Sequence, residues 1–139
     1  MSMIKRVTLT IYENNRAVKL STPLNFYKND SLLIKFEVEK YNFELREFQR
    51  VNPLQAVAFI ETPDGRDSVD TTVIDGQTIE VKLLPKHTSE VGKSKMQFVI
   101  RDTDGCQLAT PPFAYEVEPL INDAILSIDE NGNIIILGQ

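Results

Sequence analysis

Two side chains in this sequence have the reactivity of a catalytic base or nucleophile: the single histidine, His87, and the single cysteine, Cys106. A nucleophile is activated by a neighbouring base, which a third group orients. His87 stands in a polar connector between Lys86 and Thr88, without a serine motif or an orienting carboxylate. Cys106 follows Gly105 at a turn and has no second histidine to pair with. We therefore predict a surface histidine, an incidental thiol, no catalytic residue and no enzyme.

Aspartates that precede glycine are the other candidates, because carboxylates bind metal ions. A calcium loop of the EF-hand type has ligands at positions one, three and five, glycine at six and glutamate at twelve. The stretch from Asp102 to Gly105 has its glycine two positions early, and the stretch 129–133 has no glycine at position six. Asp and Asn before Gly are instead the residues that turns with positive φ require. We predict turns at these places, with no metal and no cofactor.

Composition excludes several classes of partner. The chain has 139 residues, which fits one domain, and a formal net charge of -5. Nucleic-acid binding depends on clustered Lys and Arg, so we expect no nucleic-acid partner. No stretch approaches the roughly 20 apolar residues that cross a bilayer, so we expect no membrane partner. The first twelve residues alternate and lack the continuous apolar segment of a signal peptide, which predicts synthesis in the cytoplasm.

Apolar residues recur at every second position along most of the chain, which is typical of half-buried strands. Short strand patterns with turn residues between them, and no amphipathic helix, predict an all-β antiparallel sandwich over residues 1–120. We expect one strand over 68–74 and another over 78–84, joined by a hairpin turn at Asp75-Gly76. Pro111 and Pro112 cannot donate ladder hydrogen bonds, so the last strand should begin at Phe113 and end at Pro119. The best alternating faces are Val7, Leu9 and Ile11; Leu32, Ile34, Phe36 and Val38; and Met96, Phe98 and Ile100.

The segment from Gln55 to Glu61 is apolar at both odd and even positions. This pattern predicts a central strand that is covered on two faces, or a strand that lies beside a neighbouring module. The sequence leaves both alternatives open.

The segment from Tyr41 to Pro53 is long for a strand connection and places Tyr41, Phe43, Leu45 and Phe48 among charged residues. We interpret it as a protruding loop or short helix whose four apolar residues contact a partner. The alternative is that they fold down over one end of the core.

The tail, residues 121–139, contains Asn131-Gly132 between apolar runs, which is a strong hairpin signal. An isolated hairpin is only marginally stable in water, so this one should pack on the domain or on another copy. We predict a homo-oligomer or next-module contact made by Ile134, Ile135, Ile136 and Leu137.

Three motifs together resemble the N-terminal domain of the phage baseplate upper protein family. They are the strand and turn AVAFIETPDG (56–65), the connector that runs from Leu84-Pro85 to Val91-Gly92 and into MQF (96–98), and the closing segment TPPFAYEV (110–117). Their order and spacing agree with the family, over roughly residues 20–120. The resemblance implies an immunoglobulin-like sandwich.

For function, the resemblance implies a virion structural protein in the tail baseplate, which attaches receptor-binding appendages to the baseplate core. Such proteins act as oligomers with other tail proteins and perform no catalysis. The chain is then either a short member or the N-terminal part of a longer one.

Three other classes of function stay open at this point. A carbohydrate-binding or host-surface-binding module of a tail fibre suits the same fold, although the chain has no Trp and only four Tyr for a sugar platform. An enzyme would need an acidic pair brought together by folding. A bacterial surface immunoglobulin-like repeat would need an export signal.

Overall fold

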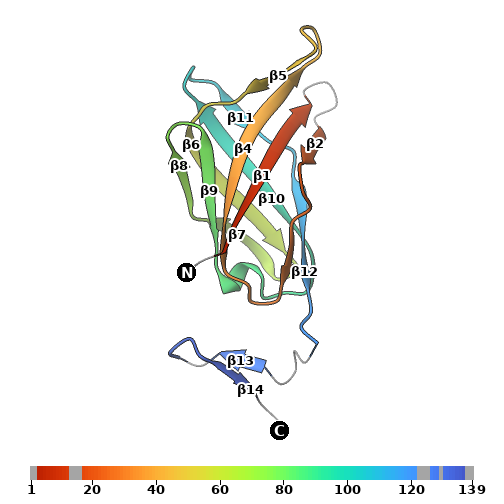
Figure 1. Cartoon of the computed structure of the whole chain (residues 1–139), viewed down its shortest axis with the longest axis vertical. Coiled ribbons are helices and arrows are strands. Elements are labelled where there is room, and N and C mark those ends of the chain that lie inside the picture. The colour runs from red at the N-terminus through yellow and green to blue at the C-terminus, as the bar shows by residue number, and fades with distance from the viewer. Residues whose placement is uncertain (1–2, 13–16, 122–125, 129, 137–139) are drawn as a thin grey trace.

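The computed structural model describes residues 3–12, 17–121, 126–128 and 130–136. Two sheets form the body of the molecule (Figure 1). Sheet A has the strand order β2 (Ala17–Leu20), β1 (Met3–Tyr12), β4 (Leu32–Asn42), β9 (Thr78–Leu83) and β8 (Thr71–Ile74), and β5 (Glu47–Arg50) pairs with the end of β4. Sheet B has the order β3 (Asn25–Tyr27), β12 (Phe113–Glu118), β10 (Gly92–Asp102), β6 (Pro53–Thr62) and β7 (Gly65–Val69), with β11 (Gln107–Ala109) beside β10.

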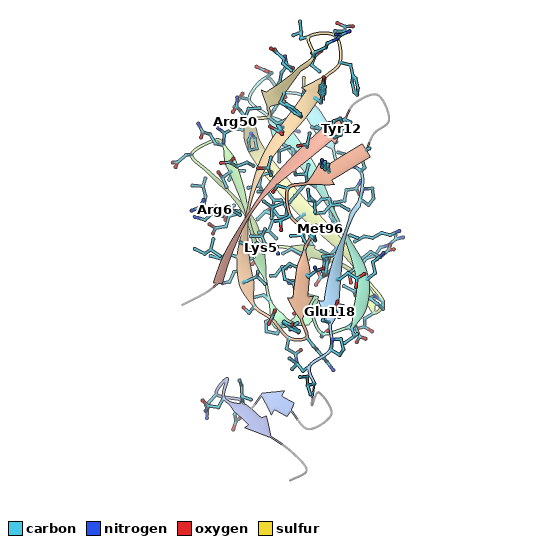
Figure 2. All side chains as sticks on the ribbon, turned by 45° about the vertical axis from the view of Figure 1, so that its right-hand side comes forward. Lys5, Arg6, Tyr12, Arg50, Met96 and Glu118 are labelled. Atoms are coloured by element: carbon cyan, nitrogen blue, oxygen red, sulfur yellow. The ribbon has the colours of Figure 1, made fainter. Side chains whose placement is uncertain are left out.

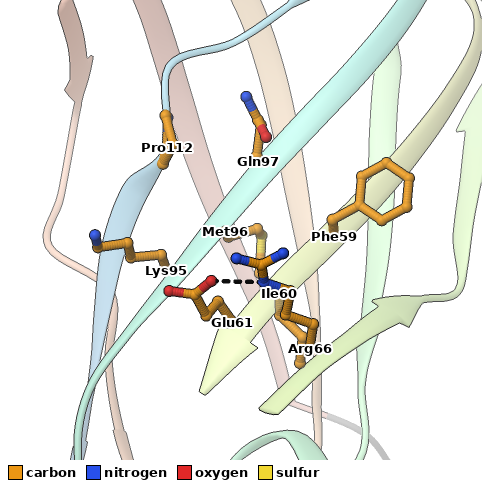
Figure 3. Close-up of a pocket in the computed structure, with 8 residues that line it drawn as sticks. All are labelled: Phe59, Ile60, Glu61, Arg66, Lys95, Met96, Gln97 and Pro112. Carbon is orange, nitrogen blue, oxygen red and sulfur yellow. Dashed lines mark hydrogen bonds and ion pairs between the residues drawn. The ribbon is translucent and has the colours of Figure 1, made fainter. Parts of the chain in front are cut away.

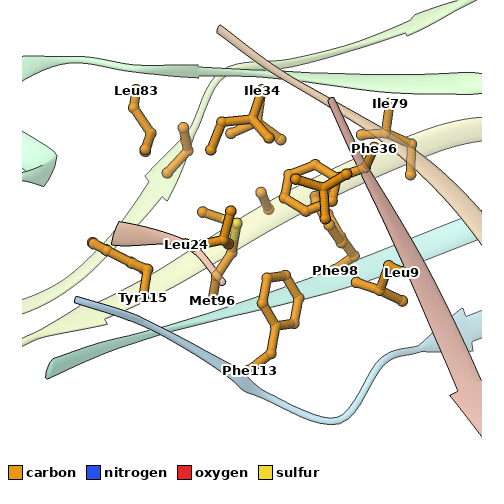
Figure 4. Close-up of a cluster of buried hydrophobic side chains, with 14 of the residues drawn as sticks. Leu9, Leu24, Ile34, Phe36, Ile79, Leu83, Met96, Phe98, Phe113 and Tyr115 are labelled. Atoms are coloured by element: carbon orange, nitrogen blue, oxygen red, sulfur yellow. The ribbon is translucent and has the colours of Figure 1, made fainter. Parts of the chain in front are cut away.

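One continuous core lies between the two sheets (Figure 4). The predicted alternating faces supply it, since Phe36, Phe98 and Tyr115 are fully buried and come from both sheets. Phe36 contacts Phe98 edge to face, with ring centroids 4.9 Å apart. Each buried aliphatic or aromatic side chain contributes roughly 1.5–3 kcal/mol, and this burial stabilises the fold without a disulfide. The all-β sandwich is confirmed.

Among the described strands, two pairs are parallel, so the expectation of a wholly antiparallel sandwich is wrong. The alternation does not reveal strand direction. β1 pairs with β4 in parallel, and β3 pairs with β12 in parallel. The reason is the path of the chain: β2 turns back along the edge of sheet A, β3 crosses to sheet B, and β4 returns to sheet A in the direction of β1. Side-chain period sets which face is buried and carries no information on strand direction.

Turn residues do what their types predict. Asp75 and Gly76 both have positive φ, 53° and 63°, and join β8 to β9 in an antiparallel hairpin. Asp102 Oδ1 accepts hydrogen bonds from the backbone N–H groups of Asp104 at 3.0 Å and Cys106 at 2.9 Å. This carboxylate therefore stabilises a turn, and the turn prediction is confirmed there.

The expected single strand over 68–74 is wrong. β7 ends at Val69 in sheet B, and β8 begins at Thr71 in sheet A, so the chain changes sheets at Asp70. The Asp70 carbonyl accepts a hydrogen bond from Lys82 N at 3.0 Å, which fixes the crossing against β9. A crossing of one residue leaves the alternation almost unbroken, and the sequence pattern cannot show it.

The tail contains the predicted hairpin, formed by β13 (Leu126–Ile128) and β14 (Ile134–Ile136). Gly132 has a φ of 82°, as a tight turn requires. Among the described strands, these two pair only with each other, and they lie beyond the end of the sandwich at which β12 stops (Figure 1).

Candidate docking surfaces

The segment 41–53 is a β-hairpin. The expectation of a loop or short helix is wrong, because β4 continues to Asn42 and β5 pairs back along it with Tyr41 opposite Phe48. Asn42 Oδ1 accepts hydrogen bonds from the N–H groups of Glu44 and Leu45, both at 3.0 Å, and so orders the turn. The predicted contact residues thus stand on paired strands and a hydrogen-bonded turn.

The rings of this hairpin form a cluster, which we call the tip cluster: Tyr12, Tyr41, Phe43 and Phe48. Tyr41 lies 4.9 Å, centroid to centroid, from both Phe43 and Phe48, and Tyr12 lies 5.8 Å from Tyr41. The prediction missed Tyr12, which comes from β1. Its partnership with Tyr41 depends on the parallel register of β1 and β4, for which the sequence holds no signal.

Three predicted contact residues are exposed to solvent. The exposed fractions are 43% for Phe43, 61% for Leu45 and 58% for Phe48. Large apolar side chains gathered at this level of exposure mark interaction sites more often than single exposed ones do. The alternative, that they fold down over the core, is wrong for these three residues.

Charged groups border the tip cluster on the outer surface of sheet A. Arg50 on β5 pairs with Glu37 on β4 at 3.3 Å, and Glu39 accepts a hydrogen bond from Thr10 at 2.8 Å. Figure 2 places Tyr12 and Arg50 toward one end of the sandwich and Glu118 toward the other. An apolar centre with a polar border is the usual build of a protein interface.

A second apolar surface lies on the outer face of sheet B. We call it the sheet B patch and define it as Val57, Phe59, Val99 and Pro112. Val57 and Phe59 on β6 are 45% and 47% exposed, and Val99 on β10 lies directly opposite Val57. β6 is therefore a central strand of sheet B whose outer face is open to solvent in this chain. The expectation that both of its faces are covered is wrong for the single chain.

A recess of about 480 Å³ adjoins the sheet B patch (Figure 3). Phe59 and Pro112 stand on its two sides with Gln97 between them, and Lys95 also lines it on the side of Pro112. Arg66 on its border is bound to Glu61, with Nε 2.9 Å from Oε2. The recess is open and partly apolar, which suits a protein side chain better than an enclosed small molecule.

The tail hairpin carries the other predicted contacts. Ile134, at the start of β14, is 70% exposed. Ile135 and Ile136 continue β14, and Leu137 lies outside the described residues. The β4–β5 hairpin, which carries the first predicted contact set, and the tail hairpin lie at opposite ends of the molecule in Figure 1, so the two sets do not form one surface.

His87 is buried, and its prediction as a surface residue is wrong. It ends the 3-10 helix η1 (Pro85–His87), and only 3% of the residue is exposed. Its Nδ1 accepts a hydrogen bond from Leu84 N at 2.9 Å, and its Nε2 lies 3.8 Å from Asp67 Oδ2. Burial lowers the pKa of His87, and the neighbouring Lys86 ammonium lowers it further. An imidazole enclosed in this way cannot meet a substrate.

Within residues 3–12, 17–121, 126–128 and 130–136, no group of three or more His, Cys, Asp or Glu side chains has the geometry of a metal site. In the same residues, no helix has the length and apolar character needed to cross a membrane.

Comparison with known proteins finds a likeness of fold. No family model and no curated protein matches the chain. Among solved structures, it is similar to the N-terminal domain of ORF48 of phage TP901-1, with a TM-score of 0.55 and 18% sequence identity. The two share a fold. The match covers 85% of this chain and 99% of that domain, so the resemblance to the baseplate upper protein family is confirmed as a likeness of fold.

Proposed function

We propose that this chain is a structural protein of a phage tail baseplate, where it attaches receptor-binding appendages to the baseplate core. The observation that carries the proposal is the fold match over 99% of the N-terminal domain of phage TP901-1 ORF48. Three sequence motifs, made of turn and core segments of this fold, resemble the same family. The proposed location is the virion, and the proposed partners are other tail proteins.

The build of the sandwich supports an adaptor role. A rigid core holds two exposed apolar surfaces in fixed positions, the tip cluster on sheet A and the patch on sheet B. Hydrogen-bonded strands carry both surfaces, so little side-chain and loop ordering is needed on association. Rigid presentation of this kind suits a protein that binds neighbouring subunits of an assembly.

The tip cluster is the proposed contact with a neighbouring tail protein. Aromatic residues are enriched at the centres of interfaces and contribute disproportionately to binding. Phe43 and Phe48 project aromatic surface from an ordered hairpin, and Leu45 extends the apolar area through the turn. We expect a partner groove that accepts these three side chains.

The test of the virion role starts from purified particles of the phage that encodes the chain. Mass spectrometry should find the chain in the particles, and gold-labelled antibodies against it should bind at the tail tip in electron micrographs. Particles that lack the chain, or label that falls on the head or along the tail tube, would contradict the proposal.

A complementation experiment tests the tip cluster. A phage with the gene disrupted should recover plaque formation when the wild-type chain is supplied, and should fail to recover with Phe43→Ser. Ile4→Ser, which changes another exposed apolar residue of sheet A, is the matched control and should complement. Equal complementation by both variants would remove the tip cluster as the contact.

Glycan binding by the purified chain distinguishes the main alternative. A carbohydrate-binding module should retain cell-wall polysaccharide or give signals on a glycan array. An adaptor should instead bind neighbouring tail proteins and give no glycan signal.

A further inference from the structure

Two parts of the molecule have no partner element among the described residues: the tail hairpin and the sheet B patch. Within those residues, the hairpin is a sheet of two strands, β13 and β14, which pair with each other and with no strand of the sandwich. A two-stranded sheet is marginal in water unless something packs on it. The patch exposes Phe59 at 47% and Val57 at 45% on the opposite side of sheet B from the core.

The strand register gives the hairpin one aliphatic face. Leu126 lies opposite Ile136, and Ile128 lies opposite Ile134, so these four positions share a face. The alternate positions, Ser127 and Ile135, share the other face. By residue type, the first set of positions is aliphatic throughout.

Charge also matches the hairpin to the patch. Residues 119–139 contain Asp123, Asp129 and Glu130 and no Lys or Arg. On the outer face of sheet B, Lys95 and Arg101 are exposed, and neither forms an ion pair with any carboxylate of the described residues. Lys95 lies opposite Glu61 in the register of β10 and β6, and Glu61 itself is bound to Arg66. An acidic hairpin that approached this face would meet two exposed cations, which aids encounter and orientation.

The length of the linker leaves little slack for docking within one chain. Gly92 pairs with Val117 near the end of β12, and the patch lies beside Gln97 and Val99, five to seven residues further along β10, which is about 17–23 Å at strand spacing. The seven residues from Pro119 to Ile125 span at most about 25 Å, and part of that length is needed to reverse direction after β12. A hairpin donated by another copy has no such constraint.

We propose that two copies of this chain exchange their tail hairpins, and that the aliphatic face of each hairpin docks on the sheet B patch of the other copy. In a two-fold symmetric dimer of this kind, the hairpin and the patch of each copy are both covered by the other copy. The inference stands on this chain's own surfaces and goes beyond the proposed baseplate role. It states that the hairpin and the patch bind each other between copies, whereas the likeness of fold does not say what either of them binds.

Disulfide trapping between two differently tagged copies tests the exchange. Both copies carry Cys106→Ser; one also carries Val57→Cys on the patch, and the other carries Ile134→Cys on the hairpin. Mild oxidation should give a cross-linked pair that contains both tags. A pair with Val91→Cys in place of Val57→Cys is the matched control, since Val91 is 44% exposed and lies outside the patch, and it should give no mixed product.

A chain that carries Val57→Cys and Ile134→Cys together separates the two directions of docking. At low concentration it should remain without an internal disulfide. An internal disulfide under those conditions, or no mixed product in the first experiment, would overturn the proposal.

Sedimentation measures the strength of the exchange. Phe59→Glu and Ile134→Asp should each raise the dissociation constant of the dimer at least about tenfold, because each places a charge at the centre of the contact. Phe48→Ser at the tip cluster is the control and should leave the constant unchanged. A wild-type chain that stays monomeric, or a dimer that both patch and hairpin variants leave intact, would contradict the proposal.

The two proposals fail separately. A chain absent from virions that still cross-links between patch and hairpin would defeat the baseplate role alone. A virion protein without the cross-link would defeat the exchange alone.

Discussion

The two ends of β4 are built in opposite ways. At the end near Leu32, the connector after β9 buries polar groups: Thr88 is fully buried, and His87 is 3% exposed. At the end near Asn42, the β4–β5 hairpin exposes apolar groups, with Leu45 61% and Phe48 58% exposed. Polar side chains are usually exposed and apolar ones buried, and both ends of β4 depart from this rule.

Hydrogen bonds satisfy most of the polar groups at the buried end, with His87 Nε2 left without a hydrogen-bond partner among the described residues. Tyr115 OH donates to the His87 carbonyl at 2.9 Å, Thr88 Oγ1 donates to the Asp30 carbonyl at 2.8 Å, and Asn29 N donates to the Thr88 carbonyl at 3.0 Å. These bonds tie the connector to β12 and to the turn before β4. Buried polar groups with such partners stabilise the fold, and losing one partner costs free energy.

The exposed end has no comparable internal reason for its composition. Its rings contact one another, yet much of their surface remains in water. The comparison therefore separates a polar end that maintains the fold from an apolar end that is available for binding. Four predictions test this separation.

The largest difference should come from removing one aromatic ring at each end. Tyr115→Ala should lower the free energy of unfolding by about 3–5 kcal/mol, because it empties a fully buried site. Phe48→Ala should lower it by only about 0.5–1.5 kcal/mol, the size of an aromatic pair contact. Urea unfolding followed by tyrosine fluorescence and circular dichroism measures both. Equal losses would show that the tip is part of the fold's core after all.

A single hydrogen bond tests the buried end more finely. Thr88→Val keeps the shape of the side chain and leaves the Asp30 carbonyl without the hydroxyl donor, which should cost about 1–3 kcal/mol. Ser89→Ala removes a neighbouring hydroxyl whose bond to the Lys86 carbonyl is exposed, and the loss should stay within about 0.5 kcal/mol. A Thr88→Val chain as stable as the wild type would mean that this bond contributes nothing net.

Acid should weaken the buried end through His87. Its pKa in the folded state is lowered below the ordinary 6.5, chiefly by burial, so below that pH the unfolded chain binds more protons than the folded one. Stability is then fully present above about pH 6.5 and falls as the pH drops through this value toward the folded-state pKa. Protonation at Nδ1 would also remove the acceptor for Leu84 N–H.

Unfolding midpoints measured from about pH 8 to pH 5 should show this decline in the wild type and less of it in His87→Asn, which keeps an acceptor and cannot titrate. Asp67, Asp70 and Lys86 also face the imidazole, and the two aspartates oppose the lowering of the His87 pKa. A pH dependence of equal size in both chains would assign the acid sensitivity to other groups.

The smallest effect on stability is expected at Leu45. Leu45→Ser should change the free energy of unfolding by no more than about 0.5 kcal/mol, because the side chain is mostly exposed. It should nevertheless weaken the binding of a neighbouring tail protein in a pull-down from infected cells. Asp64→Ser, at the exposed β6–β7 turn, is the control. If Leu45→Ser binds as the wild type does, the tip cluster contacts its partner without Leu45.

Local patterns were sufficient for much of the fold. The buried faces of β4 and β10 and the hairpin turn at Asp75-Gly76 agree with the alternation and turn residues of the sequence. So does the start of β12 after two prolines. Each of these depends on residues within a few positions of one another. The resemblance to the baseplate upper protein family was also predicted from short motifs of neighbouring residues.

The candidate surfaces were predicted only in part. Phe43, Leu45 and Phe48 were recognised as apolar residues without a place in the core, which their exposure confirms. Their contact function stays a prediction, as does the division into residues 1–120 and 121–139. The sequence did not reveal Tyr12 beside Tyr41, because that contact depends on two strands that are distant in the sequence.

By itself, the sequence determined which side chains face inward, where the chain turns and that a β-sandwich forms, because period and turn chemistry act over neighbouring residues. Only the tertiary structure decided that β1 and β4 run parallel, that the chain changes sheets at Asp70 and that His87 is buried. These features depend on which distant segments pair, and alternate side chains bury equally well in either strand direction.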